Sequence, residues 1–128
     1  MNVVDSSGWL EYFADGPNAE FFAPVIENVS ELIVPSISIY EVSKRVLQQR
    51  DEGDALRAIA VMRQGMEVGL DTTLALHAAR LSVAYKLPMA DSVMLATARA
   101  HEATLWTQDA DFKGIEGVEY IERKGSAP

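Results

Sequence analysis

Short runs of hydrophobic residues alternate along the chain with longer stretches in which hydrophobic residues recur every three or four positions. The short runs are rich in β-branched residues and are bounded by polar or turn-forming residues, a pattern typical of buried strands. They predict strands over residues 2–4, 31–35, 67–71, 104–107 and 118–122. The longer stretches predict helices over residues 7–14, 19–29, 38–50, 54–66, 72–85 and 91–101.

Local signals help to set the expected boundaries. Pro35 is expected to end the second strand, with Ser38 at the start of the next helix and Asp54 as the N-cap of the one after it. Leu47 and Leu56 are among the side chains that the spacing predicts to face inward. Strands that alternate with helices predict an α/β domain with a mostly parallel sheet, although the order of the strands does not follow from this pattern.

The length of 128 residues suits one domain over residues 1–128, and we find neither an internal repeat nor a linker. Residues 124–128, with the sequence KGSAP, are expected to form a loose tail. The 48% hydrophobic content is enough for a core of this size. The sequence therefore predicts one folded domain with a short C-terminal extension.

Cysteine is absent from the sequence, which excludes disulfides, zinc–thiolate sites and thiol catalysis and suits a reducing cytoplasm. Hydrophobic runs are too short to span a membrane, and the first residues do not resemble a signal peptide, so we expect a cytoplasmic protein. The net charge of −8 disfavours nonspecific binding to nucleic acid. Divalent cations held among the acids would reverse the local field.

Acidic residues stand where strands end and helices begin. Asp5 follows the first expected strand, Glu41 lies one turn into the helix after the second, and Asp91 begins a helix after a proline turn. Asp109 and Asp111 follow the strand at residues 104–107. Ligand sites of open parallel sheets lie beyond the carboxyl ends of the strands, so we expect these carboxylates to converge.

Each acid also has an ordinary structural explanation. Asp5 can cap a helix, as can the serines that follow it, and Ser38 with Glu41 matches a capping box. Asp91 is favoured by the dipole at a helix start, and aspartate is common in turns such as the one at residues 109–111. As a group, however, the acids would repel one another unless cations lay among them. Oxygen ligands without cysteine favour Mg²⁺ or Mn²⁺ over zinc.

Four stretches in order, VVDSSGWLEYF, PSISIYEVSKRV, LPMADSVMLATARAH and LWTQDADF, resemble those of PIN-domain nucleases. The similarity is greatest to the VapC-type toxin ribonucleases of VapBC-type (type II) toxin–antitoxin pairs. It implies a three-layer α/β sandwich, with a mostly parallel sheet flanked by helices. It also implies a metal-dependent endoribonuclease in which Asp5, Glu41, Asp91 and Asp109 are catalytic, and in which Asp5, Asp91 and Asp109 bind Mg²⁺ or Mn²⁺.

The resemblance further implies hydrolysis of RNA phosphodiester bonds that leaves a 5′-phosphate and a 3′-hydroxyl. The implied partners are a cognate antitoxin protein and RNA, in a homodimer or in a heteromer with the antitoxin. Thr107 and Asp111 match supporting positions of the last motif, where Gln108 replaces a residue that is often basic. Lys44 and Arg45 are candidates for phosphate contacts, and the ordinary alternative is a solvated helix face or an ion pair of Arg45 with Glu41.

Two other readings compete with a nuclease. A catalytically silent PIN-like binding module would suit the acidic charge, although all four matching acids are present. Haloacid-dehalogenase-type phosphatases need a second acid two residues after the first, where this chain has Ser7. Receiver domains need a pair of acids before the first helix and a lysine after a late strand, and the sequence matches neither requirement.

Overall fold

A five-stranded parallel sheet forms the centre of the computed structural model, which describes residues 1–124. All strand pairs are parallel, and the order across the sheet is β3-β2-β1-β4-β5. The strands are β1 (Asn2–Val4), β2 (Leu32–Pro35), β3 (Met66–Val68), β4 (Thr104–Thr107) and β5 (Val118–Tyr120). This arrangement confirms the predicted α/β class, and each strand overlaps an expected one.

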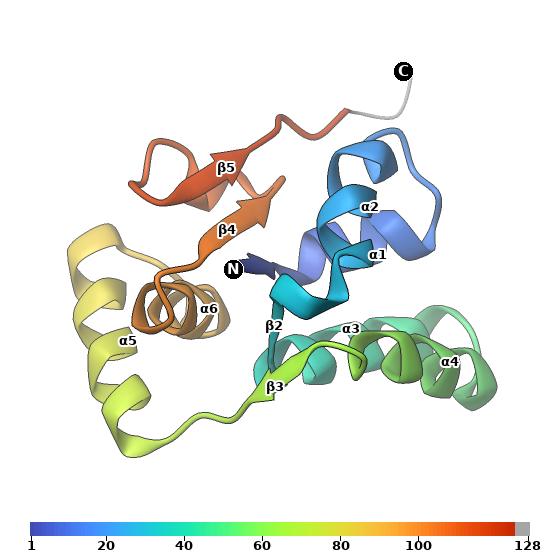
Figure 1. Cartoon of the computed structure of the whole chain (residues 1–128), viewed down its shortest axis with the longest axis horizontal. Helices are drawn as coiled ribbons and strands as arrows, with labels where there is room; N and C mark the ends of the chain where they lie inside the picture. Colours follow the sequence, from blue (N-terminus) through green and yellow to red (C-terminus); the bar gives the residue numbers. More distant parts are fainter. Residues whose placement is uncertain (125–128) are drawn as a thin grey trace.

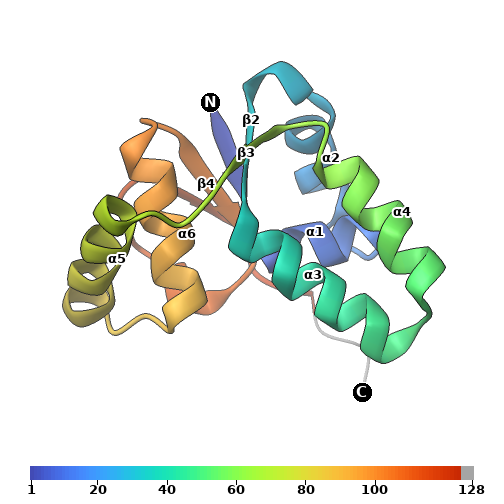
Figure 2. The ribbon, with the colours of Figure 1, turned by 90° about the horizontal axis from the view of Figure 1, so that it is seen from below.

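Helices cover both faces of the sheet, as Figures 1 and 2 show. The helices α5 and α6 lie on one side, and α1 to α4 lie on the other. The bounds are α1 (Ser6–Phe13), α2 (Ala19–Glu27), α3 (Ser36–Gln49), α4 (Glu52–Met62), α5 (Thr72–Tyr85) and α6 (Met89–Ala100), with short 3-10 turns at η1 (Val29–Glu31) and η2 (Ala110–Phe112). The architecture is the expected three-layer sandwich.

Alternation along the strands produces two hydrophobic cores. Val3 and Leu105 face α5 and α6, whereas the next residue of β1, Val4, faces α1 and α2. Trp9 and Phe22, both fully buried, fill the second core. Successive side chains of a strand point to opposite faces, so a run in which every residue is apolar supplies both layers.

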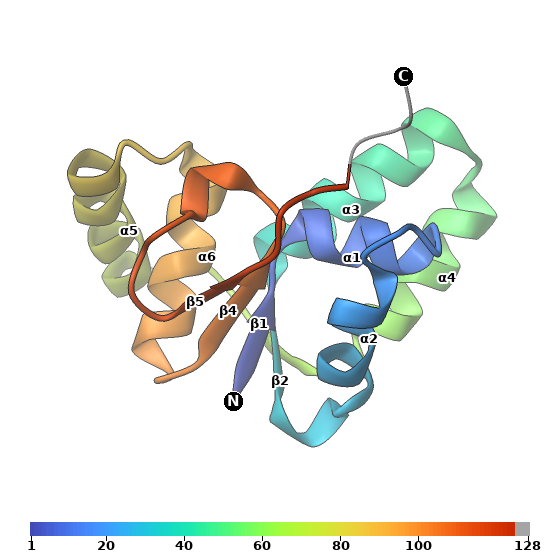
Figure 3. The same cartoon turned by 90° about the horizontal axis from the view of Figure 1, so that it is seen from above.

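The register of the sheet places the ends of β1 and β4 side by side. Val4 pairs with Trp106, and the backbone N–H of Asp5 donates to the carbonyl oxygen of Trp106 at 3.1 Å. Asp5 and Thr107 therefore leave the sheet together at its carboxyl edge, where α1 also begins (Figure 3). This edge carries the residues described in the next section.

Three predicted helix starts were late, including that of α6, which begins at Met89 rather than at residue 91. The helix α3 begins at Ser36, directly after Pro35, so Ser38 lies buried inside the helix and the proposed capping box with Glu41 does not form. The helix α4 begins at Glu52 with Asp51 as its N-cap, and it ends at Met62 rather than at residue 66. Asp51 caps α4 with its side chain, whereas α3 begins after Pro35 without a side-chain cap.

Two predicted core residues are exposed instead. Leu47 is 52% exposed and Leu56 is 58% exposed. The side of α4 that is buried differs from the predicted one and is formed by Ala55, Ala58 and Met62. Most of the expected tail at residues 124–128 lies outside the described residues. None of the helices in residues 1–124 combines the length and apolar character that a membrane crossing needs.

Candidate active site

Asp5 is the most buried acid of the site, with 2% of its surface exposed. It is the N-cap of α1, since its Oδ1 accepts hydrogen bonds from the backbone N–H of Gly8 at 3.0 Å and from Ser7 Oγ at 2.7 Å. Its Oδ2 accepts a hydrogen bond from Thr107 Oγ1 at 2.7 Å. The capping explanation of Asp5 is therefore correct, and one oxygen also links α1 to the end of β4.

Thr107 joins two of the acids. Its fully buried hydroxyl donates to Asp5 and accepts a hydrogen bond from the backbone N–H of Asp109 at 2.9 Å. Asp109 in turn accepts from the backbone N–H of Asp111 at 2.9 Å, which starts the η2 turn. One hydroxyl thus fixes both the carboxylate at the end of β1 and the loop that follows β4.

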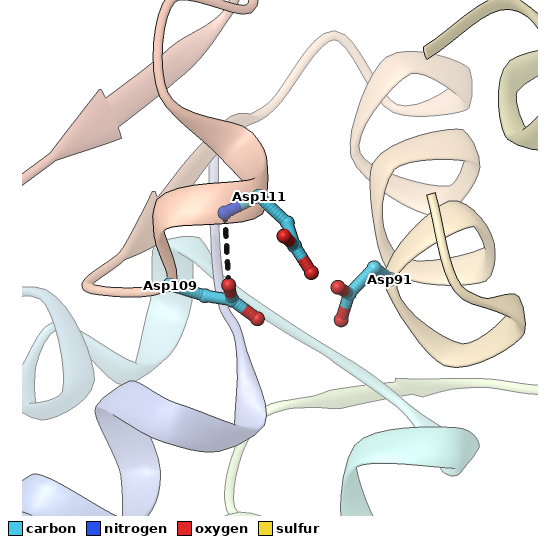
Figure 4. Close-up of side chains that lie close together, drawn as sticks. All are labelled: Asp91, Asp109 and Asp111. Atoms are coloured by element: carbon cyan, nitrogen blue, oxygen red, sulfur yellow. Dashed lines mark hydrogen bonds between the residues drawn. The ribbon is translucent and has the colours of Figure 1, made fainter. Parts of the chain in front are cut away.

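Three carboxylates meet in the space beyond the sheet. Oxygen atoms of Asp91, Asp109 and Asp111 all lie within 4.8 Å of one another. Figure 4 shows Asp91 at the start of α6 pointing across to the two aspartates of the η2 turn. Asp91 is the third residue of α6, where the partial positive charge of the helix N-terminus favours an acid.

Glu41 reaches the site from α3. Its Oε1 accepts a hydrogen bond from Ser6 Oγ at 2.6 Å, across 35 residues of sequence. This contact replaces the expected capping box, and within residues 1–124 Glu41 forms no ion pair with Arg45. Glu41 is therefore oriented by the first residue of α1, beside Asp5.

Two of the acids, Asp5 and Asp91, have raised pKa values. Burial raises the pKa of Asp5 from 3.8 to about 6, against the opposing effect of its three hydrogen-bond donors. Burial also raises the pKa of Asp91 to about 7, and negative charges on the other acids add to it, in the order Asp109, Asp5, Asp111 and Glu41. The charges of the other four acids thus act on Asp91, and the charge of Asp109 acts on Asp5.

The site suits a hard divalent cation. Carboxylate oxygens are the ligands that Mg²⁺ and Mn²⁺ prefer, and neither cysteine nor histidine belongs to the acidic cluster. A cation would offset the repulsion that raises the pKa of Asp91. The donor set fits Mg²⁺ or Mn²⁺.

The remaining candidates lie around the acids in different ways. Lys44 and Arg45 are exposed on α3 and line a groove together with Glu41. Gln108 is buried, and its amide group donates to the carbonyl oxygen of Ser7 at 3.3 Å. Gln108 is therefore part of the scaffold and is not free to contact a phosphate.

Sequence reasoning missed two contributors. Ser6 appeared only as an alternative helix cap, yet it orients Glu41. Asn18 was not singled out, although its Nδ2 donates to Gln108 Oε1 at 2.9 Å. Nothing in the local pattern marks either residue, because both contacts join segments that only the folded sheet brings together.

Comparison with known proteins agrees with this fold. A family model described as PIN domain matches residues 3–118. The chain belongs to the PIN-domain family. All the acids of the site lie within the matched part of this PIN domain. No curated protein sequence gives a significant match.

Solved structures similar to this PIN domain include a toxin–antitoxin complex from Klebsiella pneumoniae, with 23% identity, a TM-score of 0.78, and 93% of this chain and 96% of that chain covered. The VapC20 toxin of Mycobacterium tuberculosis, which cleaves the sarcin–ricin loop, has 14% identity, a TM-score of 0.75, and coverage of 91% and 95%. VapBC from Salmonella typhimurium bound to DNA has 17% identity, a TM-score of 0.70, and coverage of 95% and 97%. At these identities the likeness shows a shared fold.

Proposed function

We propose that this PIN domain is a metal-dependent endoribonuclease and the toxin of a toxin–antitoxin pair. The observation that carries the proposal is the convergence of three carboxylates within 4.8 Å, next to a buried aspartate of raised pKa. Acids held this close without a counter-charge are costly, and pKa values perturbed in this way are frequent at functional sites. The similarity to VapC-type toxins adds support for RNA as the substrate.

Asp5, Asp91 and Asp109 are the proposed ligands of Mg²⁺ or Mn²⁺. Asp111 is proposed as a supporting residue, because its carboxylate lies close to those of Asp91 and Asp109. A bound divalent ion supplies charge neutralisation at the phosphate and lowers the pKa of a water molecule. The protein holds these carboxylates in place, through Thr107 for Asp5 and through the η2 turn for Asp109.

Glu41 is the proposed group that orients the attacking water and accepts its proton, since its carboxylate is already fixed by Ser6. The water oxygen forms a bond to phosphorus as the bond from phosphorus to the 3′-oxygen breaks, and the departing 3′-oxygen takes a proton from solvent water. The products are a 5′-phosphate and a 3′-hydroxyl. A cognate antitoxin protein is the proposed partner in the cytoplasm, in a heteromer with this chain or with its homodimer.

The test is cleavage of RNA by purified protein with Mg²⁺ or Mn²⁺, in parallel with an Asp91→Asn variant. Asp15→Asn is the matched control, because Asp15 is exposed beyond the far end of α1 and has a positive φ of 51°, which asparagine also tolerates. We expect cleavage by the wild type and the control but not by Asp91→Asn. Expression without antitoxin should arrest growth in the same pattern.

Folded wild type that leaves RNA intact under these conditions would contradict the enzyme assignment. Growth arrest without RNA cleavage would favour the silent binding module, which the net charge of −8 also suits. Cleavage that survives Asp91→Asn would remove Asp91 from the catalytic group.

A further inference from the structure

A polar groove of about 520 Å³ lies beside the acids, between α1 and α3. Its wall on α1 includes Ser6 and Ser7, and its wall on α3 includes Tyr40 and Glu41. Because Ser6 donates to Glu41 and Ser7 donates to Asp5, the groove opens directly next to the candidate active site. Its volume is in the range of pockets that bind small organic groups, so a nucleotide-sized group fits it.

Positive charge collects in this groove although the chain as a whole carries −8. Lys44 and Arg45 of α3 and Arg123 of the C-terminal segment line it, against two acids, Glu11 and Glu41. Both acids already accept hydrogen bonds, Glu11 from the backbone N–H of residue 18 and Glu41 from the first serine of α1. Within residues 1–124 none of the three basic side chains forms an ion pair, so their charges face solvent.

The position of Arg123 follows from an anchored backbone. After β5, the backbone N–H of Ile121 donates to the carbonyl oxygen of Thr107 at 3.0 Å, and Asn18 Nδ2 donates to the carbonyl oxygen of Glu122 at 3.1 Å. Figure 3 shows this segment running from β5 toward α1 and α3. Arg123 also lines a neighbouring pocket with Asp109, so it lies between the groove and the acidic loop.

Tyr40 adds an aromatic surface to the same groove. It is 59% exposed, it precedes Glu41 in α3, and Lys44 Nζ lies 5.9 Å from the centroid of its ring. A large exposed aromatic ring beside several cations is the combination by which proteins hold single-stranded nucleic acid, since bases stack on the ring while the cations follow the phosphates.

We propose that this groove binds a single-stranded segment of RNA next to the bond that is cut. Tyr40 stacks against a base, and Arg123 binds backbone phosphate together with Lys44 and Arg45. The proposal rests on the ribonuclease function proposed above. It gives an acidic protein a confined cationic path to its active site, and it makes a flexible strand, rather than a rigid duplex, the form of RNA that enters.

Binding and cleavage can be measured separately. Fluorescence anisotropy with a labelled single-stranded oligoribonucleotide, in buffer with a metal chelator, reports affinity without cleavage. We expect Arg123→Ala to weaken binding and to reduce the slope of log Kd against log salt concentration by about 0.7, the value for one phosphate contact with a single strand. Arg80→Ala, which removes the same charge from the exposed surface of α5, should keep the wild-type slope.

Tyr40 has a different signature because it carries no charge. Tyr40→Ala should weaken binding about fivefold or more at unchanged salt slope, whereas Tyr40→Phe should bind as the wild type does. If Arg123→Ala and Arg80→Ala behave alike, or if Tyr40→Ala changes only the oligomeric state, the groove assignment is overturned. Wild type that binds the oligonucleotide in the expected pattern but never cleaves it with Mg²⁺ would refute the proposed function and leave the groove in place.

Discussion

Replacement of Asp5 by asparagine should stabilise the metal-free protein relative to wild type, and this gain in unfolding free energy should grow as the pH rises. The pKa of Asp5 is about 6 in the folded protein, mainly because of burial, and 3.8 is its ordinary value. A raised pKa means that the folded state binds the proton more tightly than the unfolded state does. Stability from this group is therefore fully present below about pH 4 and is lost as the pH rises through about 6.

The size of the effect follows from the shift. A difference of about two pKa units corresponds to about 3 kcal/mol of unfolding free energy. The asparagine side chain cannot ionise, it caps a helix about as well as aspartate, and Thr107 Oγ1 can accept from its amide instead of donating to a carboxylate. The Asp5→Asn variant should therefore gain up to about 3 kcal/mol relative to wild type between about pH 4 and pH 7.

The assay is urea unfolding in a metal chelator across this pH range, followed by the combined fluorescence of Trp9 and Trp106. Asp15→Asn serves again as the exposed control and should show a constant difference from wild type. Only the difference between variants is read. The part of the Asp91 titration that does not depend on Asp5 cancels, and the part caused by the Asp5 charge is lost in Asp5→Asn, which adds to the gain in the same direction. If the difference in unfolding free energy between Asp5→Asn and wild type stays constant or falls as the pH rises, buried Asp5 does not destabilise the folded protein when it ionises, and the reasoning is refuted.

Three further changes have defined outcomes. Millimolar Mg²⁺ or Mn²⁺ should raise the Tm of the wild type at pH 7 by mass action, and an unchanged melting curve would contradict a cation site. Thr107→Val should cost about 1–3 kcal/mol in urea unfolding because it removes the hydrogen bond to Asp5 Oδ2, whereas Thr107→Ser should retain most of the stability. Gly8→Ala should cost about 1–3 kcal/mol because its Cβ would lie 2.7 Å from atoms of Phe22 and Val4; unchanged stability would mean that this core yields easily.

Sequence patterns located most elements because their signals are local. The strands at residues 2–4 and 104–107 were predicted with their observed bounds, since short β-branched runs are bounded by polar residues. The helix start at Asp54 failed because capping residues are not unique: Asp51 offers the same chemistry three residues earlier and is the cap in the folded chain. The start at Ser38 failed because α3 begins directly after Pro35 without a side-chain cap.

The candidate site was predictable as far as the carboxyl-edge rule reaches. The rule that ligand sites lie beyond the carboxyl ends of parallel strands predicted that Asp91 and Asp109 lie at the same edge of the sheet. The partners that hold the acids were not predictable in the same way. The contact of Ser6 with Glu41 and that of Asn18 with Gln108 depend on side-chain placement across 35 and 90 residues, which no local pattern encodes.

The pairing of β1 with β4 also governs when the site can exist during synthesis. Asp5 leaves the ribosome well before Thr107, its hydrogen-bond partner, which follows 102 residues later. Closing a loop of that length costs about 4 kcal/mol of chain entropy beyond a constant, and β4 must be present to recover it. A nascent chain therefore carries Asp5 and Asp109 apart until nearly all of these residues have been made, so the acidic site stays unassembled for most of the time that the chain is on the ribosome.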